Sequence, residues 1–301
     1  PFHFGRRLRQ LINKHHLARP LYMGGGSAAL LPERELRMMV EAMLSSREIL
    51  VTNNFHSTDF CGFSPGSAIN RIEPPPYDNN LSWLLHQVGL PMVNLPRTPG
   101  TLLDVDTPAE LLVLKLHPDT GPQARRYLES LGLDTSRLEG VLPTFTDKEK
   151  EIFVGGRVSS STWQYLERQT ACRVRVVAEE RSMRSSGREY RGEVHALLGY
   201  HYQAVGGRRF FAELAQMADA AFLDSRVIMA HQGPLPKTAD RFWSDLYRPE
   251  EIEDPFLREL TQEAMEAPLP VVLGGHSLIS GGMYGLVDTA WRRRDAERQG
   301  G

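Results

Sequence analysis

Short apolar runs alternate with stretches of helical periodicity along most of the chain. Over residues 17–52 the pattern predicts a strand at PLYM, a glycine turn at GGGS, a helix, and a second strand at EILVTN. Apolar residues within that helix recur every three or four positions, at Leu36, Met39, Val40 and Met43. A helix over 79–89 and a strand at MVNLP continue the alternation. Strands separated by helices at this spacing are typical of a doubly wound, mostly parallel α/β sheet.

The same alternation starts again after a polar segment near the middle of the chain. Residues 121–149 mix helical periodicity with polar turns and end in the charged run TDKEKE, which indicates a boundary between domains. Beyond it, the pattern predicts buried strands in EIFVGG, CRVRVVAEE, SRVIMAHQG and LPVVLGGHS, with helices between them. We therefore predict an α/β protein of two doubly wound, mostly parallel domains, at residues 1–120 and 150–301.

Composition narrows the classes of protein and of partner. The 301 residues are 41% hydrophobic and 24% charged, as in ordinary globular proteins, and the formal net charge of -2 gives no general attraction to nucleic acid or to an anionic membrane. Cys61 and Cys172 are too few for a disulfide framework or a zinc site, so we expect a reducing, cytoplasmic location. No apolar run reaches the roughly 18 residues of a membrane span. Because the chain begins at Pro1 in what resembles the middle of a domain, we expect further sequence upstream.

The segment LLDVDTPAELLVLKLHP, at 102–118, combines a helix start with two acidic residues. Thr107 and Glu110 have the spacing of a capping box, which is typical of the first turn of a helix. That pattern accounts for the helix but not for Asp104. Asp104 lies two positions before Asp106, so the two side chains share one face if this part of the segment is a strand.

The order of motifs over residues 4–117 resembles the later two thirds of a nucleotidyltransferase domain of the GT-A type. The segments that carry the resemblance are FGRRLRQLI, GGSAALLPEREL and DVDTPAEL. The family includes molybdenum-cofactor guanylyltransferases and phospholactate guanylyltransferases, in which one strand ends in a motif like Ala-Asp-x-Pro-Leu-Leu and the domain closes with Asp-x-Asp-Thr-Pro-Glu-Asp-Leu. The resemblance implies a nucleotide-diphospho-sugar transferase fold that is truncated at its N-terminus here. It also implies that residues 53–65 are a loop facing the acceptor.

The same resemblance implies a function and a set of site residues for the first domain. Such enzymes transfer a nucleoside monophosphate from a nucleoside triphosphate to a phosphorylated acceptor, and carboxylates hold a divalent metal, here expected to be Mg²⁺. By position, Asp104 and Asp106 match the metal-binding end of the last strand. Gly25, Gly26 and Ser27 match the substrate-binding turn, although the family favours an aspartate at the position of Ser27.

Glycine and polar residues follow the predicted strands of the second domain. Because ligands of an open parallel sheet bind at the carboxyl ends of its strands, we expect these residues to lie together. Gly155 and Gly156 allow close approach of a ligand, and Arg157 offers charge-assisted hydrogen bonds. Ser159 begins a helix whose free N–H groups favour a phosphate. The turn after the last strand repeats the arrangement with Gly275, His276 and Ser277. The predicted ligand is an anionic or phosphorylated small molecule.

Three residues of this domain are candidates for acid–base catalysis: His276, Glu180 and His231. Three other charged residues, Arg181, Arg226 and Asp224, are equally expected to form ion pairs that hold the loops in place instead of binding a ligand. The sequence leaves open whether the chain is an enzyme. The leading hypothesis is a nucleotidyltransferase. One alternative is a catalytically degenerate protein that binds a nucleotide or phosphorylated metabolite for regulation. Another is that the second domain is an independent hydrolase or isomerase.

Overall fold

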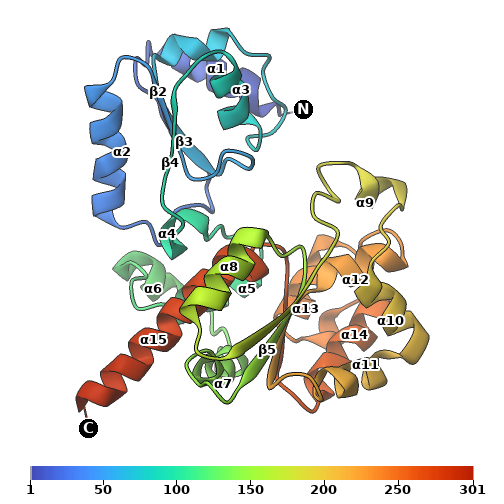
Figure 1. Cartoon of the computed structure of the whole chain (residues 1–301). Coiled ribbons are helices and arrows are strands. Elements are labelled where there is room, and N and C mark those ends of the chain that lie inside the picture. Colours follow the sequence, from blue (N-terminus) through green and yellow to red (C-terminus); the bar gives the residue numbers. More distant parts are fainter. Residues whose placement is uncertain (1, 301) are drawn as a thin grey trace. The chain divides into compact units, whose positions relative to one another are not determined.

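The computed structural model describes residues 2–300 and divides the chain into two compact units, Pro1–Asp104 and Val105–Gly301 (Figure 1). The division falls earlier than the limit at residue 120 that the sequence indicated. Residues 121–149, expected as a boundary segment, contain two helices of the second unit. The reason is the helix that starts at Pro108, which buries most of its residues within the second unit.

The first unit has a four-stranded sheet in the order β1-β3-β2-β4. Its strands are β1 (Leu21–Met23), β2 (Ile49–Thr52), β3 (Phe60–Ser64) and β4 (Met92–Asn94). Its helices are α1 (Phe4–Lys14), α2 (Glu33–Ser45), α3 (Leu81–Gln87) and α4 (Pro99–Leu102), with a 3₁₀ turn η1 (Gly66–Asn70). Strand β3 is antiparallel to both β1 and β2, and β4 is parallel to β2, so the sheet is mixed rather than mostly parallel.

Strand β3 lies inside the segment that was expected to be a loop, residues 53–65. All of its residues are buried, so it lacks the alternation of apolar and polar positions that marks a half-exposed strand. Residues 53–59 connect it to β2. This connection is too short for the crossover that parallel neighbours need, and the two strands therefore pair antiparallel.

Helices cover both faces of this mixed sheet. Leu50 and Phe63 pack with apolar residues of α1 and α3 on one face. Met39 and Met43 of α2 pack with Val51 on the other face. Of the four apolar positions that predicted this helix, Met39 and Met43 are buried and Val40 is exposed, so the apolar spacing follows the buried side of α2 only in part.

The second unit is built on a sheet in the order β6-β5-β7-β8, in which every neighbouring pair is parallel. The strands are β5 (Glu151–Gly156), β6 (Arg173–Ala178), β7 (Ala220–Asp224) and β8 (Val271–Gly274). One face carries α7 (Ser136–Phe145), α8 (Ser160–Gln169) and α15 (Met283–Gly300), with α5 (Pro108–Leu116) and α6 (Pro122–Ser130) beside them. The other face carries α10 (Leu197–Val205), α11 (Gly207–Leu214), α12 (Ser225–Gln232), α13 (Thr238–Asp245) and α14 (Pro255–Glu266). The shorter elements are α9 (Arg188–Arg191), the 3₁₀ turn η2 (Pro249–Glu251) and the π-helical turn η3 (Leu278–Gly282).

The segment SRVIMAHQG forms helix α12, so the strand predicted there is wrong. The strand of this region is β7, which ends at Asp224, and α12 begins at the next residue. Every residue from Ser225 to Ala230 is buried, so the helix has no exposed polar face. Periodicity cannot distinguish such a helix from a buried strand. His231 consequently lies at the C-terminal end of a helix and not at the end of a strand.

The strand order places a topological switch between β5 and β7. From β5 the chain passes through α8 to β6 on one side, whereas β7 lies on the other side of β5. The helices that follow β5 and β7 lie on opposite faces of the sheet (Figure 1). Ligands of open α/β sheets bind where the connections of adjacent strands diverge in this way, at the carboxyl ends of the strands.

Candidate functional site

A buried ion pair lies where β5 and β7 end. Arg157, the residue after β5, donates from Nε to Asp224 Oδ2 at 2.5 Å and from Nη2 to Asp224 Oδ1 at 3.0 Å. The Asp224 side chain is fully buried. Burial opposes its ionisation, but the charge and hydrogen bonds of Arg157 outweigh burial and hold the pKa of Asp224 below its usual range. Part of the hydrogen-bonding capacity predicted for a ligand at Arg157 is therefore used within the protein.

Gly156 allows this ion pair to form. Its φ of +118° favours glycine, and a Cβ at this position would lie 2.5 Å from the Cβ of Asp224. Gly155 is also crowded, since a Cβ there would lie 2.8 Å from the ring of Phe153. The sequence predicted that a ligand approaches the backbone at these two glycines. In the structure, side chains of the protein itself occupy that space.

A second buried ion pair lies at the start of α12. Arg226 donates to both carboxylate oxygens of Asp245, from Nη1 at 2.5 Å and from Nη2 at 2.6 Å. Both side chains are almost completely buried. Ser225 donates its hydroxyl to the carbonyl oxygen of Gly274 at 3.2 Å, which ties the start of α12 to the end of β8. The two ion pairs and this hydrogen bond therefore stabilise the edge at which β5, β7 and β8 end.

The turn after β8 contributes Gly275, His276 and Ser277 to the same edge. His276 is exposed, and the charges of Arg157 and Asp224 act on it. The surrounding protein disfavours the protonated imidazole and Arg157 adds to this effect, so the pKa of His276 lies below its usual value. A neutral imidazole near neutral pH is suited to accept a proton from a ligand.

The hydroxyl of Ser277 has a different partner from His276. It donates to Asp106 Oδ2 at 2.7 Å. Among the residues that the structure describes, no hydrogen bond joins Ser277 to His276, so the paired serine and histidine of a serine hydrolase are not formed. Asp106, expected as a metal ligand, here holds the turn after β8.

Helix α8 starts at Ser159 as the sequence predicted. The Oγ of Ser159 accepts a hydrogen bond from the backbone N–H of Thr162 at 3.0 Å, which is an N-cap. The same oxygen lies 2.8 Å from the hydroxyl of Ser161. The Ser159 side chain therefore stabilises the helix start, and its role in binding a ligand stays a prediction.

The capping box of α5 buries a carboxyl group near this edge. Glu110 accepts hydrogen bonds through Oε2 from the backbone N–H of Thr107 at 2.7 Å and from its hydroxyl at 2.9 Å. Oε1 is buried and has no hydrogen-bond partner among the described residues. Burial and the negative charge of Asp245 raise the pKa of Glu110 to about 8. The group is therefore protonated near neutral pH.

Glu180 and His231 have contacts that do not include His276. Glu180 pairs with Arg188, with 2.5 Å between Oε2 and Nη1. His231 accepts a hydrogen bond through Nδ1 from the backbone N–H of Ala196 at 3.1 Å. Both interactions hold the connection between β6 and α10. In the part of the chain that the structure describes, the three predicted acid–base residues thus do not form one group of contacts.

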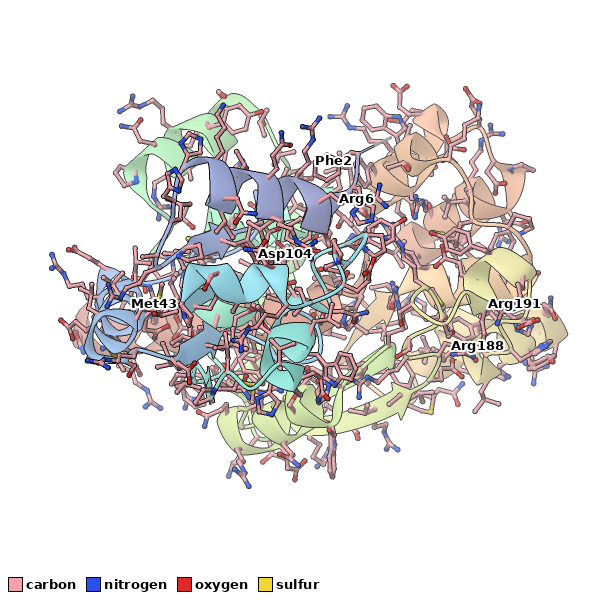
Figure 2. All side chains as sticks on the ribbon, turned by 90° about the horizontal axis from the view of Figure 1, so that it is seen from above. Phe2, Arg6, Met43, Asp104, Arg188 and Arg191 are labelled. Atoms are coloured by element: carbon pink, nitrogen blue, oxygen red, sulfur yellow. The ribbon has the colours of Figure 1, made fainter. Side chains whose placement is uncertain are left out.

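In the first unit, the turn after β1 lies against Asp104. A backbone bridge pairs Ser27 with Asp104, which Figure 2 labels. The Oγ of Ser27 donates to the carbonyl oxygen of Gly24 at 2.9 Å, and Gly25 and Gly26 lie between them in the turn. The resemblance implies two carboxylates at this place. The structure has the carboxylate of Asp104 and the hydroxyl of Ser27, which is already hydrogen-bonded to Gly24.

At position 27 this turn supplies a hydroxyl where the expected Mg²⁺ site has a carboxylate. Mg²⁺ in such enzymes is bound by one or two carboxylates together with substrate phosphates. Asp104 is anchored in the first unit by its bridge to Ser27, whereas Asp106 is anchored in the second unit by Ser277. Ser27 is not a carboxylate, so the turn after β1 does not supply a second carboxylate beside Asp104.

Asn53 links the polar groups at this edge of the first unit. Its buried side chain accepts hydrogen bonds from the backbone N–H groups of Asp59 and Phe60, each at 3.1 Å. It donates to Asp59 Oδ2 at 2.7 Å and to the carbonyl oxygen of Thr101 at 3.0 Å. All four bonds stay within the unit, so Asn53 stabilises the connection between β2 and β3.

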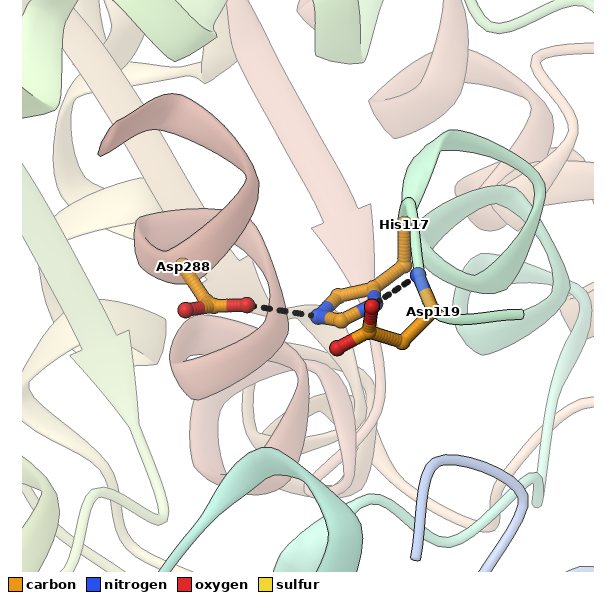
Figure 3. A group of neighbouring side chains, drawn as sticks. All are labelled: His117, Asp119 and Asp288. Atoms are coloured by element: carbon orange, nitrogen blue, oxygen red, sulfur yellow. Dashed lines mark hydrogen bonds and ion pairs between the residues drawn. The ribbon is translucent and has the colours of Figure 1, made fainter. Parts of the chain in front are cut away.

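His117, Asp119 and Asp288 lie close enough together to bind a metal ion (Figure 3). His117 Nε2 is 3.1 Å from Asp288 Oδ2, and its Nδ1 accepts from the backbone N–H of Asp119 at 3.2 Å. The guanidinium of Arg292 contacts both carboxylates, at 2.7 Å from Asp119 Oδ2 and 2.9 Å from Asp288 Oδ2. Because Arg292 already supplies the positive charge, this group is an ion-pair network that joins the end of α5 to α15.

Comparisons of the chain with family models, curated proteins and solved structures gave no match. No helix within residues 2–300 is both long and apolar enough to span a membrane. The arguments for a function therefore come from the geometry of the two units and from the motifs of the sequence.

Sequence reasoning did not find Asp245 or the pairing of Asp224 with Arg157. The buried apolar residues of α12 resembled a strand, so the prediction missed the end of β7 at Asp224. A usable signal was the Asp-Ser pair at 224–225, because such residues commonly start a helix after a strand. Nothing in the sequence near Asp245 indicates its distant partner Arg226.

Proposed function

We propose that the second unit binds a phosphorylated or otherwise anionic small molecule at the carboxyl edge of β5, β7 and β8. We further propose that the chain transfers a nucleoside monophosphate from a nucleoside triphosphate to that molecule. The observation that carries the first part is the position of His276 in the field of Arg157 and Asp224, at the switch between β5 and β7. The second part is supported by the resemblance over residues 4–117.

His276 has the properties of a base for the attacking group of the acceptor. It is exposed, and its lowered pKa keeps the imidazole neutral near neutral pH. Asp106 and Ser277 hold the turn that carries it. In this proposal Mg²⁺ accompanies the nucleoside triphosphate, because the first unit lacks the second carboxylate that would retain an ion of its own.

A protein that senses a nucleotide without turnover is the second candidate. The observation in its favour is Ser27, which stands where the family favours an aspartate and whose hydroxyl is bonded to Gly24. Such a protein would bind the nucleotide and the phosphorylated molecule without transferring a group between them.

Calorimetric titration of the chain with the four common ribonucleoside triphosphates and Mg²⁺ tests for binding, and release of pyrophosphate with a panel of phosphorylated acceptors tests for transfer. His276→Ala is expected to lower turnover by about 10²- to 10⁴-fold while triphosphate binding persists, because removal of a general base acts on the chemical step. His201→Ala is the matched control, since His201 is an exposed histidine of α10 that pairs with Glu213.

The outcomes separate the candidates. Absence of triphosphate binding, or transfer that neither His276→Ala nor Asp106→Ala affects, would contradict the nucleotidyltransferase. Binding without transfer to any acceptor of the panel would favour the sensor.

A further inference from the structure

The connection between β6 and α10, residues 179–196, starts at the carboxyl edge of the parallel sheet and projects from the rest of the second unit (Figure 1). Two ion pairs join residues of the connection to one another. Arg188 pairs with Glu180, and Arg191 pairs with Glu193; Figure 2 labels both arginines. These two ion pairs stabilise the connection internally but do not attach it to the neighbouring helices.

An apolar cluster and a hydrogen bond attach the connection to α12. Met183 is buried in a small cluster with Val227 and Ala230 of that helix. At the end of the connection, the backbone N–H of Ala196 donates to Nδ1 of His231 at 3.1 Å, and His231 lies in the last turn of α12. The apolar contact does not depend on pH. The hydrogen bond does, because it needs an imidazole nitrogen that carries no proton.

The neighbours of His231 fix which ring nitrogen carries the proton. Because Nδ1 accepts from Ala196, the proton of the neutral imidazole is on Nε2. Nε2 lies 3.3 Å from Oε1 of Gln203, to which it donates. Protonation of the imidazole places a second N–H at Nδ1, opposite the N–H of Ala196. Two donors cannot form a hydrogen bond with each other, so the imidazolium loses this contact.

The backbone of α10 packs directly against the His231 ring. A Cβ at Gly199 would lie 2.3 Å from Cγ of His231. The ring of Tyr200 meets the imidazole edge-on, with 4.3 Å between the ring centroids. The imidazole therefore has no room to move toward α10. It avoids the N–H of Ala196 only by separating from the connection and from the start of α10.

The backbone of the connection is itself strained at two positions. Glu180 has a φ of +56° and Ser182 a φ of +65°. This left-handed region is unfavourable for residues that have a side chain, and such residues persist in it only where surrounding contacts hold them. Loss of the contact with His231 removes one of the contacts that oppose this strain.

The groups around His231 set the pH range of the effect. Burial and a positive charge on His195 disfavour the protonated imidazole and hold the pKa of His231 below its ordinary 6.5. The carboxylates of Glu179 and Glu180 oppose this shift, but the first accepts from N–H groups at the start of α10 and the second pairs with Arg188. Because the pKa is lowered in the folded state, the contact is complete above pH 6.5 and is lost as the pH falls through the lowered value.

We propose that His231 is an acid-sensitive latch: its neutral imidazole holds the connection 179–196 against α12, and protonation of the imidazole releases the connection. The connection starts at the sheet edge where the proposed ligand binds, so its release changes access to that edge. This inference goes beyond the proposed function, because the movement of the connection can be measured without any ligand.

Hydrogen–deuterium exchange of the whole chain at about pH 7.5 and about pH 5 tests the latch, with mass spectrometry as the readout and correction for the intrinsic exchange rate. Protection of peptides within 179–200 is expected to fall about three- to tenfold at the lower pH. The reason is that a pKa difference of one unit between the latched and released forms changes the opening equilibrium about tenfold. Peptides of the buried strand β5 should keep their protection.

Two substitutions of His231 give opposite expectations. His231→Asn retains an acceptor, Oδ1, near the place of Nδ1 and does not titrate, so protection of the connection should match wild type at pH 7.5 and persist at pH 5. His231→Ala removes the acceptor and should give low protection at both pH values. His201→Asn is the matched control, since His201 is an exposed histidine of α10 that pairs with Glu213, and it should retain the wild-type pH dependence.

Equal protection of the connection at the two pH values in wild type would overturn the proposal. So would a His231→Asn variant that keeps the wild-type pH dependence, because another group would then be the one that titrates. A parallel loss of protection in β5 would also count against the latch, since the acid effect would then be unfolding of the whole unit.

Trypsin digestion at about pH 7.5 gives a second readout that needs no acid. The connection contains several arginines, after which trypsin cleaves, and it should be cut faster in His231→Ala than in wild type or His231→Asn. An equal rate of cleavage in all three proteins would show that His231 does not hold the connection.

Discussion

The two units hold polar side chains at a sheet edge in different ways. In the first unit, the neutral amide of Asn53 makes hydrogen bonds that stay within the unit. In the second unit, Arg157 and Arg226 form buried ion pairs with Asp224 and Asp245. Neutral hydrogen bonds thus stabilise the edge of the first unit, whereas opposite charges stabilise the edge of the second. The proposed anion site lies at the charged edge of the second unit, whereas the motifs on which the proposed transfer activity rests lie in the first.

Strand direction underlies this difference. In the parallel sheet of the second unit all strands end at the same edge, and α8, α12 and α15 follow there. The N–H groups at the start of these helices add partial positive charge. In the first unit, β3 runs the opposite way and begins at this edge, so the region is occupied by a short connection instead of a helix start.

The largest change in the free energy of unfolding is expected when a buried ion pair of the second unit is broken. Arg226→Met leaves Asp245 buried without its counter-charge, which is expected to lower the free energy of unfolding by about 3 to 5 kcal/mol. Denaturant unfolding followed by circular dichroism measures the change. The double variant Arg226→Met and Asp245→Leu should recover a large part of the loss, because it removes both charges. If the single and double variants are equally unstable, burial of the Asp245 charge is not the cause.

A smaller change in stability, which depends on pH, is expected for Glu110→Gln. Because burial raises the pKa of Glu110 to about 8 from an ordinary 4.5, the folded state binds this proton more tightly than the unfolded state. The contribution of Glu110 to stability is therefore complete at low pH and decreases as pH rises toward 8, by at most about 1.4 kcal/mol per pH unit. Glutamine still accepts a hydrogen bond from Thr107 and does not ionise.

The melting temperatures of wild type and Glu110→Gln from pH 5 to pH 8 test this prediction. The variant should gain stability relative to wild type as pH rises. Glu167→Gln, an exposed position on α8, is the control and should show no such trend. A difference between wild type and Glu110→Gln that does not change with pH would rule out the proposed titration.

The smallest effect on stability is expected in the first unit. It comes from a substitution that adds a carboxylate to the edge of its sheet. Ser27→Asp should lower stability by about 1 kcal/mol, because the hydrogen bond from Ser27 to Gly24 is lost. It should also make the melting temperature rise on addition of Mg²⁺, since two carboxylates then lie at the bridge with Asp104. Ser27→Asp combined with Asp104→Asn should lose this response. An identical response in wild type would show that Ser27 is not the limiting donor.

Local patterns predicted part of the fold. The capping box of Thr107 and Glu110 forms as the sequence indicated, and Ser159 caps the helix expected there. Both depend on residues three positions apart, so a single sequence contains the information. The parallel sheet of the second unit also follows from the order of elements, whereas β3 and α12 were missed because complete burial removes the periodic signal.

The candidate site was harder to predict because its charges meet across long separations. Arg157 was chosen as a ligand for a phosphate, yet its partner Asp224 comes from another strand. The division between the units was misplaced for a related reason. The sequence of α5 shows that the helix is apolar, but not which sheet it packs against.

The junction of β7 and α12 does not tolerate insertions or deletions. Asp224 ends the strand and Ser225 starts the helix, with no residue between them. One inserted residue would turn the side chains of α12 by about 100° and move Arg226 away from Asp245. The connection at 179–196, by contrast, contains many exposed residues and could gain or lose several. Homologues with different ligand preferences should therefore differ in length at 179–196 and agree in length at 224–225.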